Sequence, residues 1–89
     1  MTFYYDTTAP TFNWIIDNKT QAQSKEVRLE TSEEIQLPDE GWSLKGEENG
    51  VFVYVKTFYA NWKDKNFTVT DLAGNVSEPQ FVEVKRIDN

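Results

Sequence analysis

A short run near the C-terminal end, residues 70–77 (Thr-Asp-Leu-Ala-Gly-Asn-Val-Ser), constrains the fold of this chain more than any other feature. Asp71 can accept hydrogen bonds from backbone N–H groups, and Gly74 and Asn75 are residue types that tolerate positive φ. The run lies between Val69 and an alternating stretch at 81–87, as is typical of a connection between antiparallel strands. It predicts a hairpin that closes a small all-β domain.

Length and composition point to one small domain with its own core. The chain has 89 residues, of which 38% are hydrophobic and 15% aromatic, enough for a packed core in spite of a mean hydropathy of -0.66. It contains no cysteine, which excludes a disulfide framework and a thiolate metal site. We therefore expect a single domain over residues 1–89 that folds alone as a monomer.

The net charge of -6 is concentrated in residues 26–48, which hold eight acidic residues against Arg28 and Lys45. The rest of the chain is balanced, so it offers no basic stripe on which nucleic acid or an anionic membrane could dock. No apolar run approaches the length that a membrane span needs. The acidic segment is interpreted as a solvated face, with attraction of a cation or a basic partner as the alternative.

The apolar residues recur with a period of two, which predicts strands. In 27–31, Val27 and Leu29 should point inward, and 51–59 should be a central strand because apolar residues occupy both of its faces. Turns are expected at 47–50, where Asn-Gly suits a type I′ hairpin, and at 61–65. The expected strands are 11–16, 27–31, 51–59, 67–70 and 81–87. Residues 35–38 are either a short edge strand or an irregular crossing between sheets, because Pro38 and Gly41 end the alternation. Residues 2–5 are either a short first strand or the end of a preceding unit. About seven short strands favour an antiparallel β-sandwich, with a small barrel as the alternative.

The aromatic residues have two possible uses. Rings bury more area than other side chains, so Trp42, Tyr54 and Phe67 are expected in the core. Trp62 lies in a Lys-Asp-Lys context and is the best candidate for an exposed ring that could stack on a sugar.

The two ends of the chain resemble each other. Asp6-Thr7 matches Asp88-Asn89 at an offset of 82 residues. The match predicts that residues 6–88 are one unit of a tandem array, with 1–5 and 88–89 as junction residues.

Three stretches carry a family resemblance. Residues 6–10 are similar to a D-x-T-x-P opening, 69–77 to a V-T-D-x-A-G-N-x-S closing hairpin, and 56–61 to a K-T-Y-T-A-N stretch. Together they resemble bacterial immunoglobulin-like (Big-type) domains, which occur in tandem in surface proteins and adhesins. The resemblance implies an immunoglobulin-like β-sandwich without a disulfide, in a parent protein that is secreted or anchored in the cell wall.

Catalysis is not expected. The chain has no histidine to act as a general base and no glycine-rich phosphate loop that precedes a helix. The one ligand considered is calcium at a domain junction, because oxygen ligands suit it, with Asp6 and Asp71 as candidates and Asp88 and the Asn75 carbonyl as helpers. The alternative is that Asp6 and Asp71 only cap turns.

These inferences lead to two functional hypotheses. The first is a non-catalytic structural spacer or stalk unit of a bacterial surface protein, whose partners are the neighbouring domains of its own chain. The second is an adhesive module that binds glycan or a host protein, with Trp62 as the candidate contact.

Overall fold

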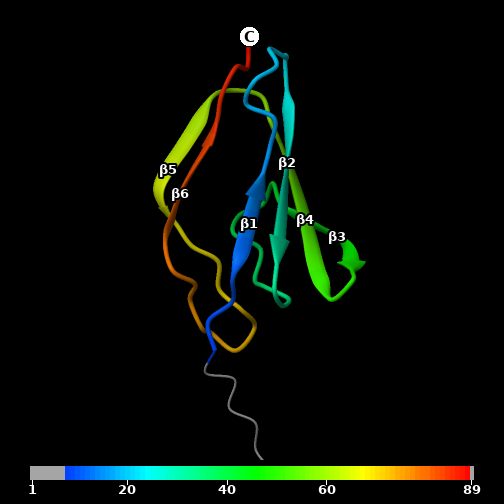
Figure 1. Ribbon diagram of the computed structural model, residues 1–89, viewed down its shortest axis with the longest axis vertical. Coiled ribbons are helices and arrows are strands. Elements are labelled where there is room, and N and C mark those ends of the chain that lie inside the picture. Colours follow the sequence, from blue (N-terminus) through cyan, green and yellow to red (C-terminus); the bar gives the residue numbers. More distant parts are fainter. Residues whose placement is uncertain (1–7, 89) are drawn as a thin grey trace, which may run out of the picture.

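The computed structural model describes residues 8–88, which form six strands in two antiparallel sheets and contain no helix. The larger sheet has the order β1-β2-β4-β3, and the smaller pairs β5 with β6 (Figure 1). The strands are β1 (Phe12–Ile15), β2 (Lys25–Thr31), β3 (Ser43–Glu48), β4 (Val51–Phe58), β5 (Trp62–Phe67) and β6 (Gln80–Val84). The predicted all-β class is confirmed, whereas the described residues give six strands in place of about seven.

The centre of the larger sheet follows the sequence pattern. β2 alternates between buried and more exposed residues, and Val27 and Leu29 are fully buried, as predicted. β4 lies between β2 and β3, which confirms it as a central strand. The turn from β3 to β4 places Asn49 at φ 53° and Gly50 at φ 80°, so the type I′ prediction is also confirmed.

The structure differs from the expected strand positions in three places. Residues 61–65 were expected to turn, but Trp62 begins β5, because the lysines of this segment point outward while the tryptophan ring packs inward. Of the two alternatives for 35–38, the edge strand does not form: the segment makes one bridge, Ile35 to Asp71, and is otherwise irregular, since Pro38 has no N–H to continue a ladder. β3 was not expected, because its residues are mostly exposed and show no apolar alternation.

The last two predicted strands begin and end elsewhere. The strand expected at 67–70 is shifted toward the N-terminus, since β5 ends at Phe67 and Thr70 forms only a bridge with Val76. The stretch 81–87 is strand only as far as Val84. Arg86 has a φ of 59°, which interrupts the ladder before Ile87 forms a separate parallel bridge with Ala22.

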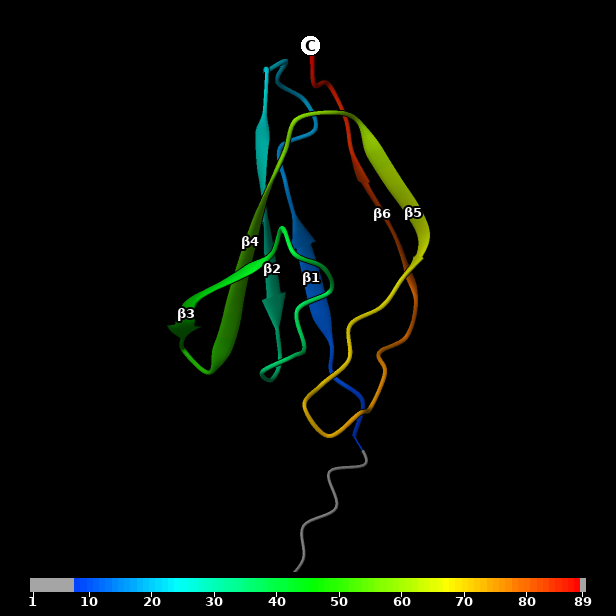
Figure 2. The same cartoon turned by 180° about the vertical axis from the view of Figure 1, so that it is seen from behind.

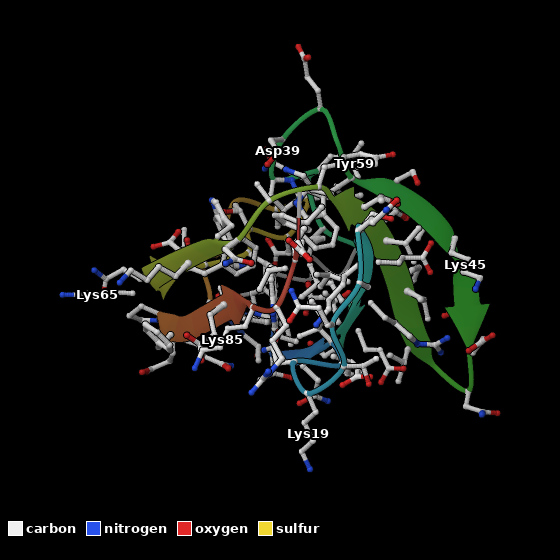
Figure 3. The ribbon with its side chains drawn as sticks, turned by 90° about the horizontal axis from the view of Figure 1, so that it is seen from above. Lys19, Asp39, Lys45, Tyr59, Lys65 and Lys85 are labelled. Atoms are coloured by element: carbon white, nitrogen blue, oxygen red, sulfur yellow. The ribbon has the colours of Figure 1, made fainter. Side chains whose placement is uncertain are left out.

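The core lies between the two sheets, which face each other in Figures 2 and 3. Trp42, Tyr54 and Phe67 are buried there, as predicted. Lys45 extends from the side of the larger sheet, whereas Lys65 and Lys85 extend from the smaller one (Figure 3). The other core residues are Phe12, Val27, Leu29, Ile35, Phe58, Val69, Val82, Val84 and Ile87.

The described chain begins and finishes at opposite ends of the molecule. The segment before β1 lies at the lower end in Figure 1, beside the 70–77 turn, and Asp88 follows β6 at the upper end. β1 and β6 both run from the lower to the upper end of the molecule in Figure 1, so the first and last strands are parallel in direction. Residues 8–88 provide no helix that could cross a membrane.

Candidate functional site

The 70–77 turn is held by a network centred on the Asp71 side chain. Its carboxylate accepts hydrogen bonds from the Asn75 backbone N at 2.8 Å and from Asn75 Nδ2 at 3.0 Å. The Asp71 backbone N donates to the Asn75 carbonyl at 2.9 Å, and Gly74 takes the positive φ of 96° that the turn needs. The predicted capping role of Asp71 is confirmed; of Gly74 and Asn75, only Gly74 uses a positive φ.

The same aspartate links the turn to the rest of the fold. Gln36 Nε2 donates to the Asp71 carbonyl at 3.1 Å, and the Gln36 backbone N donates to the Thr70 carbonyl at 2.8 Å. Asp71 is only 1% exposed. Burial by itself would raise the pKa of this carboxyl, but the hydrogen bonds with Asn75, together with those with the Glu33 side chain and the Ala73 backbone, outweigh it, and the pKa lies below its ordinary value of 3.8. Asp71 is therefore held as a carboxylate.

Of the predicted calcium ligands, only Asp71 and Asn75 lie side by side within the described residues. Asp6 lies outside residues 8–88, and Asp88 lies at the end of the molecule opposite the 70–77 turn. The Asn75 carbonyl already accepts the Asp71 N–H. No group of three or more acidic side chains in this part of the chain is arranged to hold a metal ion.

Trp62 lies at the edge of a cluster of aromatic rings. Its ring stacks on that of Trp14, with centroids 5.7 Å apart and planes at 25°, and it also contacts Phe58 at 5.4 Å and Phe67 at 6.2 Å. The residue is nevertheless 37% exposed. The predicted exposure of Trp62 is therefore partial: its neighbours fix the ring while part of it remains accessible.

The accessible part of Trp62 lines a groove of about 450 Å³ between residues 36–39 and 62–70. The 35–38 segment is joined to the chain after β5 by the Ile35–Asp71 bridge and by the bond from Gln36 N to the Thr70 carbonyl, and the groove lies between this segment and residues 62–70. Its polar groups are held in place: Lys56 Nζ contacts the Asp39 carboxylate at 2.9 and 3.0 Å, and Asp64 Oδ1 accepts from the Asn66 backbone N at 2.9 Å. A ring edge beside fixed carboxylates and amides can bind a small polar ligand.

Sequence reasoning identified Trp62 but missed the rest of this groove. Gln36, Asp39, Asp64 and Asn66 come from segments that are distant in the chain. The only available signal was the group of acidic and proline residues at 38–40, which also suits an ordinary solvated loop.

Comparison with known proteins adds no relative, since no protein-family model, curated protein or solved structure matches this chain.

Proposed function

We propose that this chain is a non-catalytic, immunoglobulin-like module that serves as a spacer or stalk unit in a bacterial surface protein. The observation that carries the proposal is the position of the two ends of the described chain, which leave the molecule in opposite directions (Figure 1). A neighbouring domain on either side would then continue the long axis. Repetition of such a unit gives an extended rod.

The strand order supports the immunoglobulin-like part of the proposal. Immunoglobulin domains pack a sheet of strands A, B, E and D against one of strands C, F and G. Here β1-β2-β4-β3 corresponds to the first sheet and β5-β6 to strands F and G, while the Ile35 bridge stands in the position of strand C. The resemblance of residues 69–77 to a Big-type closing hairpin agrees with their position between β5 and β6.

The test is to join one, two and three copies of the chain and measure each protein by small-angle X-ray scattering. A spacer should lengthen by a constant increment for each added copy. Copies that fold back on one another, with little gain in maximum dimension, would contradict the proposal.

The cellular part of the proposal has a separate test. The gene that encodes the chain should also encode further copies, an export signal and a cell-wall anchor. A parent protein that fractionates with the cytosol would exclude the surface assignment while leaving the spacer geometry intact.

A second candidate function is glycan binding in the groove beside Trp62. The specific observation in its favour is that Trp14 supports one side of a tryptophan ring that remains 37% exposed next to fixed polar groups. Planar rings of this kind stack on the apolar faces of sugars. The groove has room for only a short segment of a glycan.

Binding should be measured on an array of neutral oligosaccharides, with Trp62→Ala and Asn66→Ala as test variants and Tyr59→Ala as the matched control. Tyr59 is 68% exposed and does not line the groove. Loss of binding in both test variants but not in the control supports the site. Absence of any glycan signal excludes it, and capture of a protein that depends on Trp62 would replace glycan with a protein partner.

A further inference from the structure

The first and last strands are joined mainly by side chains. Trp14 Nε1 and Asn18 Nδ2 both donate to the Glu83 carbonyl at 3.2 Å, and Asn18 Oδ1 accepts from the Lys85 backbone N at 2.8 Å. Gln80 Nε2 donates to the Phe12 carbonyl at 3.3 Å. We call this set, together with the two backbone bonds described next, the β1–β6 seam.

The upper part of the seam is made by the backbone. Ala22 N donates to the Arg86 carbonyl at 3.1 Å, and Asp88 N donates to the Ala22 carbonyl at 2.8 Å. Along the whole seam, partners rise together in number from Phe12 with Gln80 to Ala22 with Asp88, so the two segments run parallel. Because parallel neighbours have no tight turn between them, the seam joins parts of the chain that are far apart in sequence.

The direction of the seam determines how it responds to tension. The chain enters at the lower end before β1 and leaves at the upper end after β6 (Figure 1). Pulling on the two ends therefore draws β1 and β6 past each other. Every bond of the seam is then sheared at the same time instead of being opened one after another.

The seam also controls how much chain can extend. Its four side-chain bonds each span 65–69 residues of sequence. While they hold, tension passes from β1 directly to β6, and the β2–β4 and β5–β6 ladders lie outside its path. Once these bonds and the two backbone bonds of Ala22 break, almost the whole domain becomes available to extend.

We propose that the β1–β6 seam gives this domain a mechanical function, resistance to tension along its long axis, and that Asn18 is the principal side chain in it. The inference rests on the proposed spacer function, since only a unit in a chain of domains is pulled from both ends. Asn18 holds this position because its amide satisfies two backbone groups: it donates to the Glu83 carbonyl in β6 and accepts from the Lys85 N–H just after that strand.

The experiment is force spectroscopy on tandem copies of the full chain, held at constant force through their two ends. Forced unfolding measures the unfolding rate, so the loss of a seam hydrogen bond should raise that rate under force. Asn18→Ala removes two hydrogen bonds and should raise the rate under force about tenfold. Asn18→Asp keeps the acceptor for Lys85 but loses the donor to Glu83, and it should fall between Asn18→Ala and the original chain.

Two controls separate the seam from general stability. Asn13→Ala makes the same chemical change on β1 at an exposed position and should leave the rate unchanged. Val53→Ala weakens the core on β4, outside the path of the force, and should lower equilibrium stability far more than resistance to force. An unchanged rate for folded Asn18→Ala, or an equal rise for either control, overturns the proposal.

Failure of the seam and failure of the spacer give different results. If joined copies extend in scattering but Asn18→Ala has no effect under force, the seam is wrong and the spacer stands. If joined copies fold back on one another, the spacer is wrong, whatever the force data show for the single domain.

Discussion

In the four-stranded sheet, β2 and β4 share seven consecutive residue pairs, whereas in the two-stranded sheet β5 and β6 share four pairs interrupted by an irregularity. The larger sheet is thus held by its own ladder. The smaller sheet is attached to it largely through side chains: the aromatic cluster in the middle, Tyr54 and Gln36 on one side, and the β1–β6 seam on the other. A small sheet with a short ladder depends on tertiary contacts for its stability.

The smaller sheet needs hydrogen bonds from side chains more than the larger one does, because its short ladder pairs fewer backbone groups. Within residues 8–88, every buried side-chain nitrogen or oxygen has a hydrogen-bond partner. Many of these partners are backbone groups on the smaller sheet or beside it, where the ladder leaves them unsatisfied. Side chains on β1, just after it and in the 70–77 turn therefore take the place of missing strand neighbours.

The largest effect is expected from removal of the Trp14 ring, which lies at the centre of the aromatic cluster between the two sheets. Trp14 contacts Trp42, Phe58, Trp62 and Phe67, so Trp14→Ala is expected to lower the free energy of unfolding by about 3 kcal/mol. Urea titration measures the loss, and hydrogen exchange should show β5 and β6 losing protection before β2 and β4. Phe81→Ala, at a residue that is 54% exposed, is the control and should change little. Equal loss of protection in both sheets would break the comparison.

Tyr54 makes a polar link between β4 and the segment beside the smaller sheet. Its hydroxyl accepts from the Ile35 backbone N at 2.9 Å and donates to the Ile35 carbonyl at 3.3 Å. Tyr54→Phe leaves both backbone groups without this partner and should cost about 2 kcal/mol of unfolding free energy. Tyr59→Phe, at an exposed tyrosine, should cost nothing measurable in the same titration. A neutral Tyr54→Phe would mean that the ring alone supports this contact.

Asp71 should make the smaller sheet less stable as the pH falls into the acid range. Because the folded pKa of its carboxyl is below 3.8, its contribution is complete above that value and is lost as the pH falls through 3.8 toward the folded value. Asp71→Asn places an amide donor against the Asn75 amide and should lower the melting temperature at pH 7 by roughly 5 °C.

The test is the melting temperature of both proteins from pH 7 to pH 2. The two curves should converge in acid, and Asp88→Asn, at an exposed aspartate, should follow the original chain. Curves that remain parallel down to pH 2 would exclude Asp71 as a source of the acid sensitivity.

The smallest effect is expected at an ion pair that joins β4 to the groove segment. Lys56 Nζ lies 2.9 Å from Asp39 Oδ2, and the aspartate side chain is 51% exposed. Asp39→Asn should cost about 0.5 kcal/mol at low salt and less at high salt, because water and ions screen exposed pairs. Urea titration at two salt concentrations measures it. A cost that is large and independent of salt would show that this pair acts as a buried contact.

The parts of the fold that follow from local chemistry were predictable. The type I′ turn at Asn49 and Gly50, the buried alternation of β2 and the network of the 70–77 turn depend on residues close together in the chain. Of the candidate site, the turn-capping role of Asp71 and the partial exposure of Trp62 followed from their local sequence, whereas calcium binding and sugar binding stay predictions. The groove, the position of β3 and the seam were not predicted, because each depends on segments that meet only after folding.

The sequence by itself determined that this chain is all-β, that 51–59 is central and that Asp71 caps a turn, since backbone preferences and period-two burial act over a few residues. Only the tertiary structure decided that Trp62 begins a strand, that the 35–38 segment is joined to the chain after β5, and that Asn18 bonds to both Glu83 and Lys85. The physical reason is that a hydrogen bond between residues 65 positions apart leaves no pattern in the sequence around either residue. A hydrogen bond within a turn, in contrast, requires particular residue types at neighbouring positions.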